Sequence, residues 1–218
     1  MNTAKNVIID AYEVESYLEK YGISTQILRR IVSEGQMIRN TVTENHPVTA
    51  AGTLPYHETV KAKRDALRPL GWTKQTTNNC ELTAHPSGNI TISVSGGNKE
   101  TGNQYGNPET KNPKGSQTEL LVTANINQPD LFQNDIEFNA SNLDEITCQN
   151  WVLLYYFDAH KNEVRIELSL PTSIAPNGKI NGWKSRLIID PIQLDPETDD
   201  LYQPDYAPDP DIKITRKG

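Results

Sequence analysis

The first forty positions of the chain carry apolar residues at helical spacing. One helix is expected from Ala11 to about Tyr21, where Gly22 breaks the pattern. A second helix is expected to follow Ser24, a residue that favours the N-cap position, and to run to about Arg39. The apolar positions of the two helices are Val14, Tyr17, Leu18, Tyr21, Ile27, Leu28, Ile31 and Val32. The pattern predicts a helical hairpin within residues 1–42.

The helical periodicity stops at residues 43–54, which contain a His-Pro and an Ala-Gly pair and are expected to form a linker. A third helix is expected from Pro55 or Tyr56 to Leu67. Proline favours the first turn of a helix, and a proline and a glycine follow soon after Leu67.

Beyond Trp72 the apolar residues alternate or form short continuous runs, which is typical of strands. Strands are expected at residues 81–84, 90–94, 151–157, 164–170 and 183–189. They predict a mainly antiparallel sheet with one or two packed helices, in a domain covering residues 55–190. The expected fold class is therefore α+β, with N-terminal helices followed by the sheet.

Two polar segments interrupt or follow this domain. Residues 96–115 are almost wholly Gly, Asn, Lys, Thr and Pro, so they are expected to form a mobile surface loop that cannot pack a core. Ser116 and Glu119 have the spacing of a capping box and predict a helix to about Asn127. Residues 191–218 are acidic and proline-rich and predict an extended or disordered tail.

Composition narrows the classes of protein. No apolar run approaches the roughly 18 residues that cross a bilayer, and the N-terminus lacks a signal-peptide pattern, so a cytoplasmic protein is expected. Cys80 and Cys148 have no Cys or His at ligand spacing, so no disulfide, metal or other cofactor is expected. The net charge of -7 argues against nucleic acid binding over the whole surface, although a local basic face could still bind it.

The residues Gln128-Pro129-Asp130-Leu131-Phe132 form the most informative short pattern in the chain. The pattern resembles the linear motif by which bacterial DNA polymerases and repair proteins dock on the replication sliding clamp. In that motif a glutamine amide enters a polar pocket and a Leu-Phe pair fills a hydrophobic cleft. The resemblance covers five residues and implies a sliding clamp as partner, contacted by Gln128, Asp130, Leu131 and Phe132. The alternative is that Leu131 and Phe132 belong to the core.

The helical hairpin resembles the DNA-binding helix-turn-helix motif. The positions of its inter-helix contacts and turn glycine are matched by Tyr17, Gly22, Ile23, Leu28 and Ile31. The resemblance implies that duplex DNA is contacted by Thr25, Gln26, Arg29 and Arg30 on the second helix. Leu18 departs from the motif, which usually has a small residue there, and an ordinary helical hairpin is the alternative.

Two further basic segments could contact phosphate groups. The third helix carries Lys61, Lys63, Arg64 and Arg68, for which a solvated helix face is the alternative. Lys111 and Lys114 precede the helix expected at Ser116, and a helix N-terminus attracts anions through its free N–H groups and dipole. The order of residues here is not that of a phosphate-binding loop, so nucleotide binding is not predicted, and a plain flexible loop is the favoured alternative to a phosphate contact.

A metal-dependent nuclease would use Asp158 and Glu167 as magnesium ligands, with Lys161 or Arg165 nearby. Ser169 stands where restriction-type nucleases have a lysine, and Glu167 could instead face solvent from an alternating strand. The four histidines have no partner at a catalytic spacing.

The sequence thus favours a non-enzymatic accessory or regulatory protein of bacterial DNA metabolism, encoded by a phage or mobile element, that docks on the sliding clamp. A sequence-specific DNA-binding protein and a metal-dependent nuclease are the alternatives.

Overall fold

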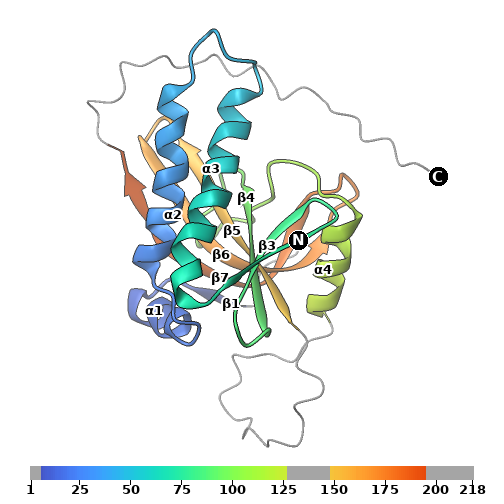
Figure 1. Ribbon diagram of the computed structural model, residues 1–218. Helices are drawn as coiled ribbons and strands as arrows, with labels where there is room; N and C mark the ends of the chain where they lie inside the picture. Colours follow the sequence, from blue (N-terminus) through green and yellow to red (C-terminus); the bar gives the residue numbers. More distant parts are fainter. Residues whose placement is uncertain (1–5, 127–147, 195–218) are drawn as a thin grey trace, which may run out of the picture.

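The computed structural model of the protein describes residues 6–126 and 148–194. These residues form one seven-stranded sheet with helices on both faces (Figure 1). The strands are β1 (Asn6–Ile8), β2 (Thr73–Thr77), β3 (Cys80–Ala84), β4 (Ile90–Gly96), β5 (Gln149–Asp158), β6 (Glu163–Ile174) and β7 (Ile180–Gln193). The helices are α1 (Ala11–Glu19), α2 (Thr25–Met37), α3 (Ala50–Leu67) and α4 (Ser116–Ile126), with short 3-10 helices η1 (Ile38–Thr41) and η2 (Arg68–Leu70).

The strands lie in the order β1-β7-β6-β5-β4-β3-β2. Neighbouring strands are antiparallel except for the pairs β1–β7 and β4–β5, which are parallel. The predicted α+β fold with a mainly antiparallel sheet is therefore confirmed. Strand β2 was not expected, because Thr73–Thr77 is wholly polar and has no alternating apolar residues.

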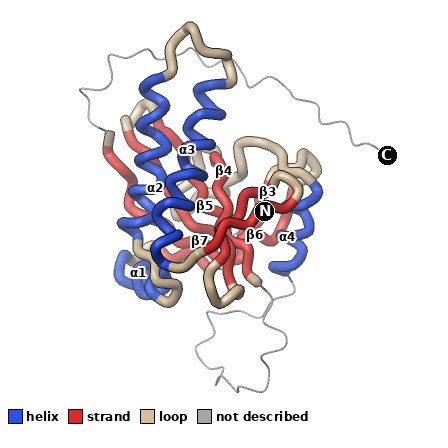
Figure 2. The backbone as a smooth tube through the Cα atoms, in the orientation of Figure 1, coloured by secondary structure: helices blue, strands red, loops and turns tan. Residues whose placement is uncertain are grey.

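The sheet is covered on both faces, by α1, α2 and α3 on one side and by α4 on the other (Figures 1 and 2). The main hydrophobic cluster joins the first three helices to the strands through residues that include Leu18, Leu28, Leu67, Ile92, Trp151 and Leu168. A smaller cluster under α4 consists of Val122, Val152, Leu154, Ile180 and Trp183. Coverage on both faces explains the continuous apolar run of β5. It also means that α1 and α2 share one core with the sheet.

The ends of α1 and α2 follow from capping residues. The Asp10 carboxylate accepts a hydrogen bond from the Glu13 N–H (3.0 Å), and the Ser24 hydroxyl accepts one from the Ile27 N–H (3.2 Å). Gly22 lies at φ +65°, the left-handed conformation in which helices commonly end. The expected N-cap at Ser24 is thus confirmed.

Helix α3 begins at Ala50, so the linker expected at residues 43–54 is shorter than predicted. The prediction placed Pro55 in the first turn, but Pro55 lies inside the helix, where its carbonyl oxygen accepts a hydrogen bond from the Thr59 hydroxyl (2.7 Å). Gly35 of α2 packs against this turn, since a Cβ at Gly35 would lie 1.8 Å from Thr59 Oγ1. The two helices therefore approach closely at a residue without a side chain.

Residues 97–115 fold back onto the sheet, so the expectation that this polar segment cannot pack is wrong. The side chains of Thr101 and Thr110 are fully buried, and Gly97 and Thr110 form an antiparallel bridge. The two threonines differ, since the buried Thr101 hydroxyl has no hydrogen-bond partner among the described residues whereas the Thr110 hydroxyl is bonded to neighbouring segments. The Thr110 hydroxyl accepts a hydrogen bond from the Ile180 N–H (3.0 Å).

A buried ion pair holds the middle of this loop. Arg186 of β7 and Glu167 of β6 are 1% and 0% exposed, and their Nη2 and Oε2 atoms are 2.5 Å apart. Arg186 also donates hydrogen bonds to the carbonyl oxygens of Asn103 (3.1 Å) and Gly106 (2.9 Å), while Glu167 accepts one from the Gly102 N–H (2.8 Å). The loop thus packs through charge-assisted hydrogen bonds instead of apolar contacts.

Strand β7 continues to Gln193, beyond the boundary at which the acidic tail was expected to begin.

None of the described helices combines the length and the apolar character that crossing a membrane requires.

Candidate functional site

The sheet divides between β3 and β4. Their ladder comprises two residue pairs, Thr83–Ile92 and Ala84–Thr91, after which the strands diverge. Further along β4, the loop takes the place of β3, since the Lys111 N–H donates a hydrogen bond to the Gly96 carbonyl oxygen (2.8 Å). A cavity of about 210 Å³ lies at this division.

Lys63 of α3 occupies the point where the ladder ends. Its side chain is fully buried, and its Nζ donates hydrogen bonds to the carbonyl oxygens of Ile92 (2.6 Å) and Glu81 (3.2 Å). Among the described residues it forms no ion pair, and burial lowers the pKa of the amine to about 7. Lys63 therefore completes the divided ladder and is not the surface phosphate contact that the sequence suggested.

The other basic residues of α3 are also engaged within the fold. Lys61 pairs with Glu58 (2.6 Å), and Arg64 pairs with Glu81. The exposed Lys61 pair is typical of a solvated helix face, whereas the part-buried Arg64 pair joins α3 to β3.

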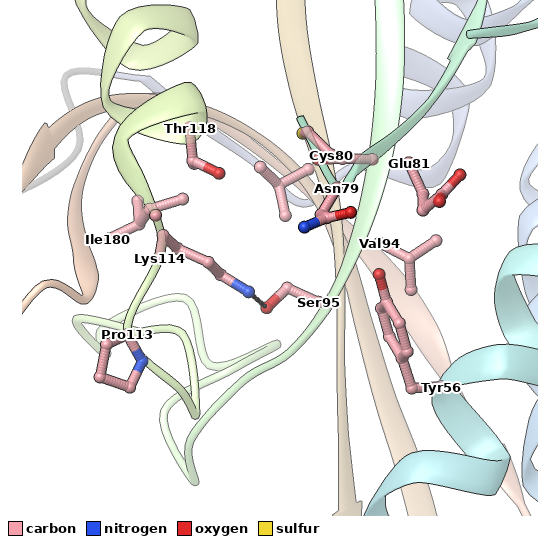
Figure 3. A pocket seen from close by; sticks show the side chains of 13 residues that line it. Tyr56, Asn79, Cys80, Glu81, Val94, Ser95, Pro113, Lys114, Thr118 and Ile180 are labelled. Carbon is pink, nitrogen blue, oxygen red and sulfur yellow. Dashed lines mark hydrogen bonds between the residues drawn. The ribbon is translucent and has the colours of Figure 1, made fainter. Parts of the chain in front are cut away.

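The cavity between β3, β4 and the start of α4 is here named the Lys114 pocket. Its lining includes Tyr56, Asn79, Cys80, Ser95, Lys114 and Thr118 (Figure 3). The Lys114 amine reaches across the pocket and donates a hydrogen bond to the Ser95 hydroxyl (2.7 Å). The backbone is held in place because the Lys114 N–H donates to the Gly178 carbonyl oxygen (2.8 Å).

No carboxylate among the described residues lies within ion-pairing distance of Lys114. Burial lowers the pKa of its amine to about 8, because the charged form loses water without gaining an acidic partner. At neutral pH this leaves a mostly protonated ammonium group with one protein acceptor and two further N–H donors. Such a group favours an anion as its missing partner.

The N-terminus of α4 adjoins Lys114 in sequence. The Gly115 carbonyl oxygen accepts hydrogen bonds from the N–H groups of Thr118 (3.0 Å) and Glu119 (3.3 Å), so the cap lies one residue before the expected Ser116. Glycine has no side-chain oxygen to cap the first turn, and the positive end of the helix dipole stays next to the pocket.

Cys80 adds a thiol to the pocket wall. Burial raises its pKa, although a hydrogen bond with Thr118 and the charges of Lys63 and Lys114 act in the opposite direction. The thiol is therefore protonated at neutral pH and is a weak nucleophile.

With Lys114 protonated, the hydrogen bonds of the pocket suit the binding of an anion. Lys114 donates to Ser95, and the Ser95 hydroxyl in turn donates to the Gly96 carbonyl oxygen (3.0 Å). A serine nucleophile activated by lysine requires the opposite polarity, with the neutral amine accepting the hydroxyl proton. The arrangement is suited to holding an anionic group.

The residues expected to contact the sliding clamp, Gln128, Asp130, Leu131 and Phe132, lie outside the described residues. Clamp docking therefore stays a prediction.

Two of the four residues expected to contact DNA are engaged within the fold. Thr25 donates hydrogen bonds to Glu15 Oε2 from its N–H (3.0 Å) and hydroxyl (2.8 Å). Arg29 Nη1 donates to the carbonyl oxygens of Asp190 (2.6 Å) and Pro191 (3.2 Å), at the edge of β7. The Thr25 contacts join α2 to α1, and the Arg29 contacts fasten the hairpin to the sheet.

The other two, Gln26 and Arg30, are exposed on α2. Arg30 pairs with Glu34 (3.4 Å) on the same helix. DNA binding through this surface stays a prediction.

The acidic residues of the nuclease interpretation are each paired with an arginine. Asp158 Oδ2 lies 2.6 Å from Arg165 Nη2, and Glu167 is buried with Arg186 instead of facing solvent. Within the described ranges, no group of three or more His, Cys, Asp or Glu residues is placed to hold a metal ion.

Of the residues in the Lys114 pocket, the sequence indicated Lys114 alone, through its position before a helix. Tyr56, Cys80 and Ser95 come from separate segments that meet where the sheet divides, and no local pattern marks them. The chain matches no protein-family model, no curated protein and no solved structure. Its function must therefore be inferred from the geometry of the pocket and from the sequence motifs.

Proposed function

We propose that this protein is a binding protein and that its Lys114 pocket takes up the phosphate group of a ligand. The observation that carries the proposal is the Lys114 ammonium group, which lines a cavity and forms no ion pair among the described residues. A charge in such surroundings is costly unless a partner of opposite sign is bound.

A phosphate group fits the pocket better than a single carboxylate. It presents several oxygens, and the pocket offers several donors: the Lys114 amine, the hydroxyl of Thr118 and the first turn of α4. Charge-assisted hydrogen bonds from lysine to phosphate are among the stronger polar interactions in proteins.

Calorimetric titration with inorganic phosphate, sulfate and acetate tests this proposal. We expect phosphate and sulfate to bind more tightly than acetate. Lys114→Met should weaken phosphate binding by at least tenfold, as expected for the loss of a hydrogen bond to a charged group. Lys99→Met, which removes the same charge from an exposed loop position, should leave binding unchanged. Absence of phosphate binding, or equal loss in both variants, would contradict the proposal.

Clamp docking is the second candidate, and the motif Gln128-Pro129-Asp130-Leu131-Phe132 favours it. The chain enters this segment from the end of α4. Asn125 is fully buried there, and its side chain donates hydrogen bonds to the carbonyl oxygens of Asn150 and Pro171 (both 3.0 Å). The next residue, Ile126, is 57% exposed. The motif begins at Gln128, two positions after Ile126 in the sequence.

In this role the protein would be a non-enzymatic accessory protein of bacterial DNA metabolism. Co-purification of the full chain with a bacterial sliding clamp tests it. We expect the wild type to retain the clamp and Gln128→Ala to lose it. If the wild type retains no clamp, clamp docking is wrong.

A further inference from the structure

The Lys114 pocket extends from one face of the sheet to the other. Tyr56 belongs to α3, which covers one face, and Lys114 precedes α4, which covers the opposite face (Figure 1). Both side chains nevertheless line the same cavity, because β3 and β4 diverge between them (Figure 3). A ligand in this cavity can therefore contact Tyr56 at one end of the cavity and Lys114 at the other, and the two ends differ in chemistry.

The Tyr56 end offers an aromatic ring and mixed hydrogen-bonding groups. Burial, followed by the neighbouring Glu81 charge, raises the pKa of the Tyr56 phenol, which therefore stays neutral. Asn79 lies in the turn between β2 and β3 at φ +63°, with its amide exposed. Glu81 uses Oε2 to accept hydrogen bonds from Arg64 and Thr76.

An aromatic ring beside amide and carboxylate groups is suited to a planar heterocycle. The ring provides a stacking surface, and the polar groups can pair with donors and acceptors on the edge of a base. The Lys114 end, in contrast, provides cationic and hydroxyl donors. The two ends together match a ligand that has a phosphate at one side and a nucleobase at the other.

We propose that the ligand of the Lys114 pocket is a nucleoside monophosphate, with its phosphate at Lys114 and its base against Tyr56. This inference rests on the proposed phosphate site and assigns the chemistry of the remaining part of the ligand.

Titration of the full chain with inorganic phosphate, ribose 5-phosphate, AMP and UMP tests the assignment. The nucleotides should bind at least tenfold more tightly than ribose 5-phosphate, the gain expected from one stacked base. Tyr56→Leu should remove that gain and leave phosphate affinity unchanged. Tyr56→Phe, which keeps the ring, should retain most of the gain. Tyr105→Leu is the matched control, because Tyr105 is 90% exposed and lies in the loop.

The outcomes separate the two proposals. If phosphate binds but the nucleotides bind no more tightly than ribose 5-phosphate, the nucleotide assignment is overturned and the phosphate site stands. A nucleotide gain that survives Tyr56→Leu places the base elsewhere and also overturns the assignment. If neither phosphate nor any nucleotide binds, both proposals fail.

Discussion

The buried basic side chains of Arg186 and Lys63 differ in whether an acidic side chain pairs with them. Arg186 is paired with the Glu167 carboxylate, and additional carbonyl groups complete its hydrogen bonds. Lys63 is hydrogen-bonded to two carbonyl oxygens and has no acidic partner in the described part of the chain. A paired charge can stay ionised in the interior, whereas an unpaired amine lowers its pKa instead.

The lowered pKa of Lys63 predicts how stability depends on pH. Its pKa is about 7 in the folded protein and 10.5 when unperturbed, so between these values the unfolded chain binds a proton that the folded protein does not. The free energy of unfolding should therefore rise with pH in this window, by at most about 1.4 kcal/mol per pH unit from this group. The contribution is constant below pH 7, where both states are protonated.

Urea unfolding at pH 7.0 and 8.5 checks this expectation. Lys63→Met should show a smaller rise than the wild type, while Lys61→Met, which removes an exposed charge from the same helix, should keep the wild-type rise. Burial also lowers the pKa of Lys114. Its contribution to the rise in the free energy of unfolding is the same in the wild type and both variants, so it does not affect the difference between them. Equal slopes in the wild type and Lys63→Met would show that the buried amine keeps its usual pKa.

Removal of Arg186 should be strongly destabilising. Arg186→Met leaves the Glu167 carboxylate buried without its partner and frees two loop carbonyl groups, which should lower the free energy of unfolding by about 3–5 kcal/mol. The exposed Arg30 is a matched control, because loss of its pair with Glu34 should cost less than about 1 kcal/mol. Denaturant unfolding measures both, and similar losses in the two variants would contradict the account of the loop.

At the scale of elements, the sequence correctly predicted the helix ends that depend on residues within the same turn. The N-cap at Ser24 and the stop at Gly22 follow from backbone chemistry within a few residues, and the structure has both. The loop at residues 96–115 was misjudged, because its partners Glu167 and Arg186 are distant in sequence. The start of α3 was misplaced because the sequence pattern places Pro55 in the first turn, whereas it lies inside the helix at the turn that packs against Gly35 of α2.

The close approach of α2 and α3 predicts opposite effects for two glycines. Gly35→Ala should lower the free energy of unfolding by about 1–3 kcal/mol, because the new methyl group would overlap Thr59. Gly52→Ala should raise it by about 0.5–1 kcal/mol, because Gly52 lies in α3 with no atom within 4 Å of the added Cβ. Thermal or urea unfolding compares them, and a destabilised Gly52→Ala together with a neutral Gly35→Ala would refute the packing described.

At the scale of the whole molecule, the Lys114 pocket arises from the topology of the sheet. Lys114 could be suspected from its position before α4, but its neighbours could not. Tyr56, Cys80 and Ser95 meet because β3 leaves β4 after two residue pairs, and Lys63 bridges carbonyl groups of the two strands where they separate. Such a site follows from long-range packing and has no short sequence signature.

The clamp motif makes its own prediction for the full chain. Replacing Leu131 and Phe132 with alanine should weaken clamp binding by about 2–4 kcal/mol, as expected for two hydrophobic anchors, and leave the melting temperature nearly unchanged. Surface plasmon resonance and thermal unfolding provide the two readouts. If the double variant unfolds instead, both side chains belong to the core and clamp docking through them is wrong.

The most direct test of the phosphate site is proton uptake when a tetrahedral anion binds. Sulfate does not titrate near neutral pH, so any proton taken up on binding must be bound by the protein. Because a bound anion raises the pKa of the Lys114 amine from about 8, sulfate binding at pH 8 should be accompanied by net proton uptake. Calorimetry in two buffers of different ionisation enthalpy measures this quantity. The account predicts uptake in the wild type and loss of sulfate binding in Lys114→Met; binding without proton uptake, or unchanged binding in the variant, would contradict it.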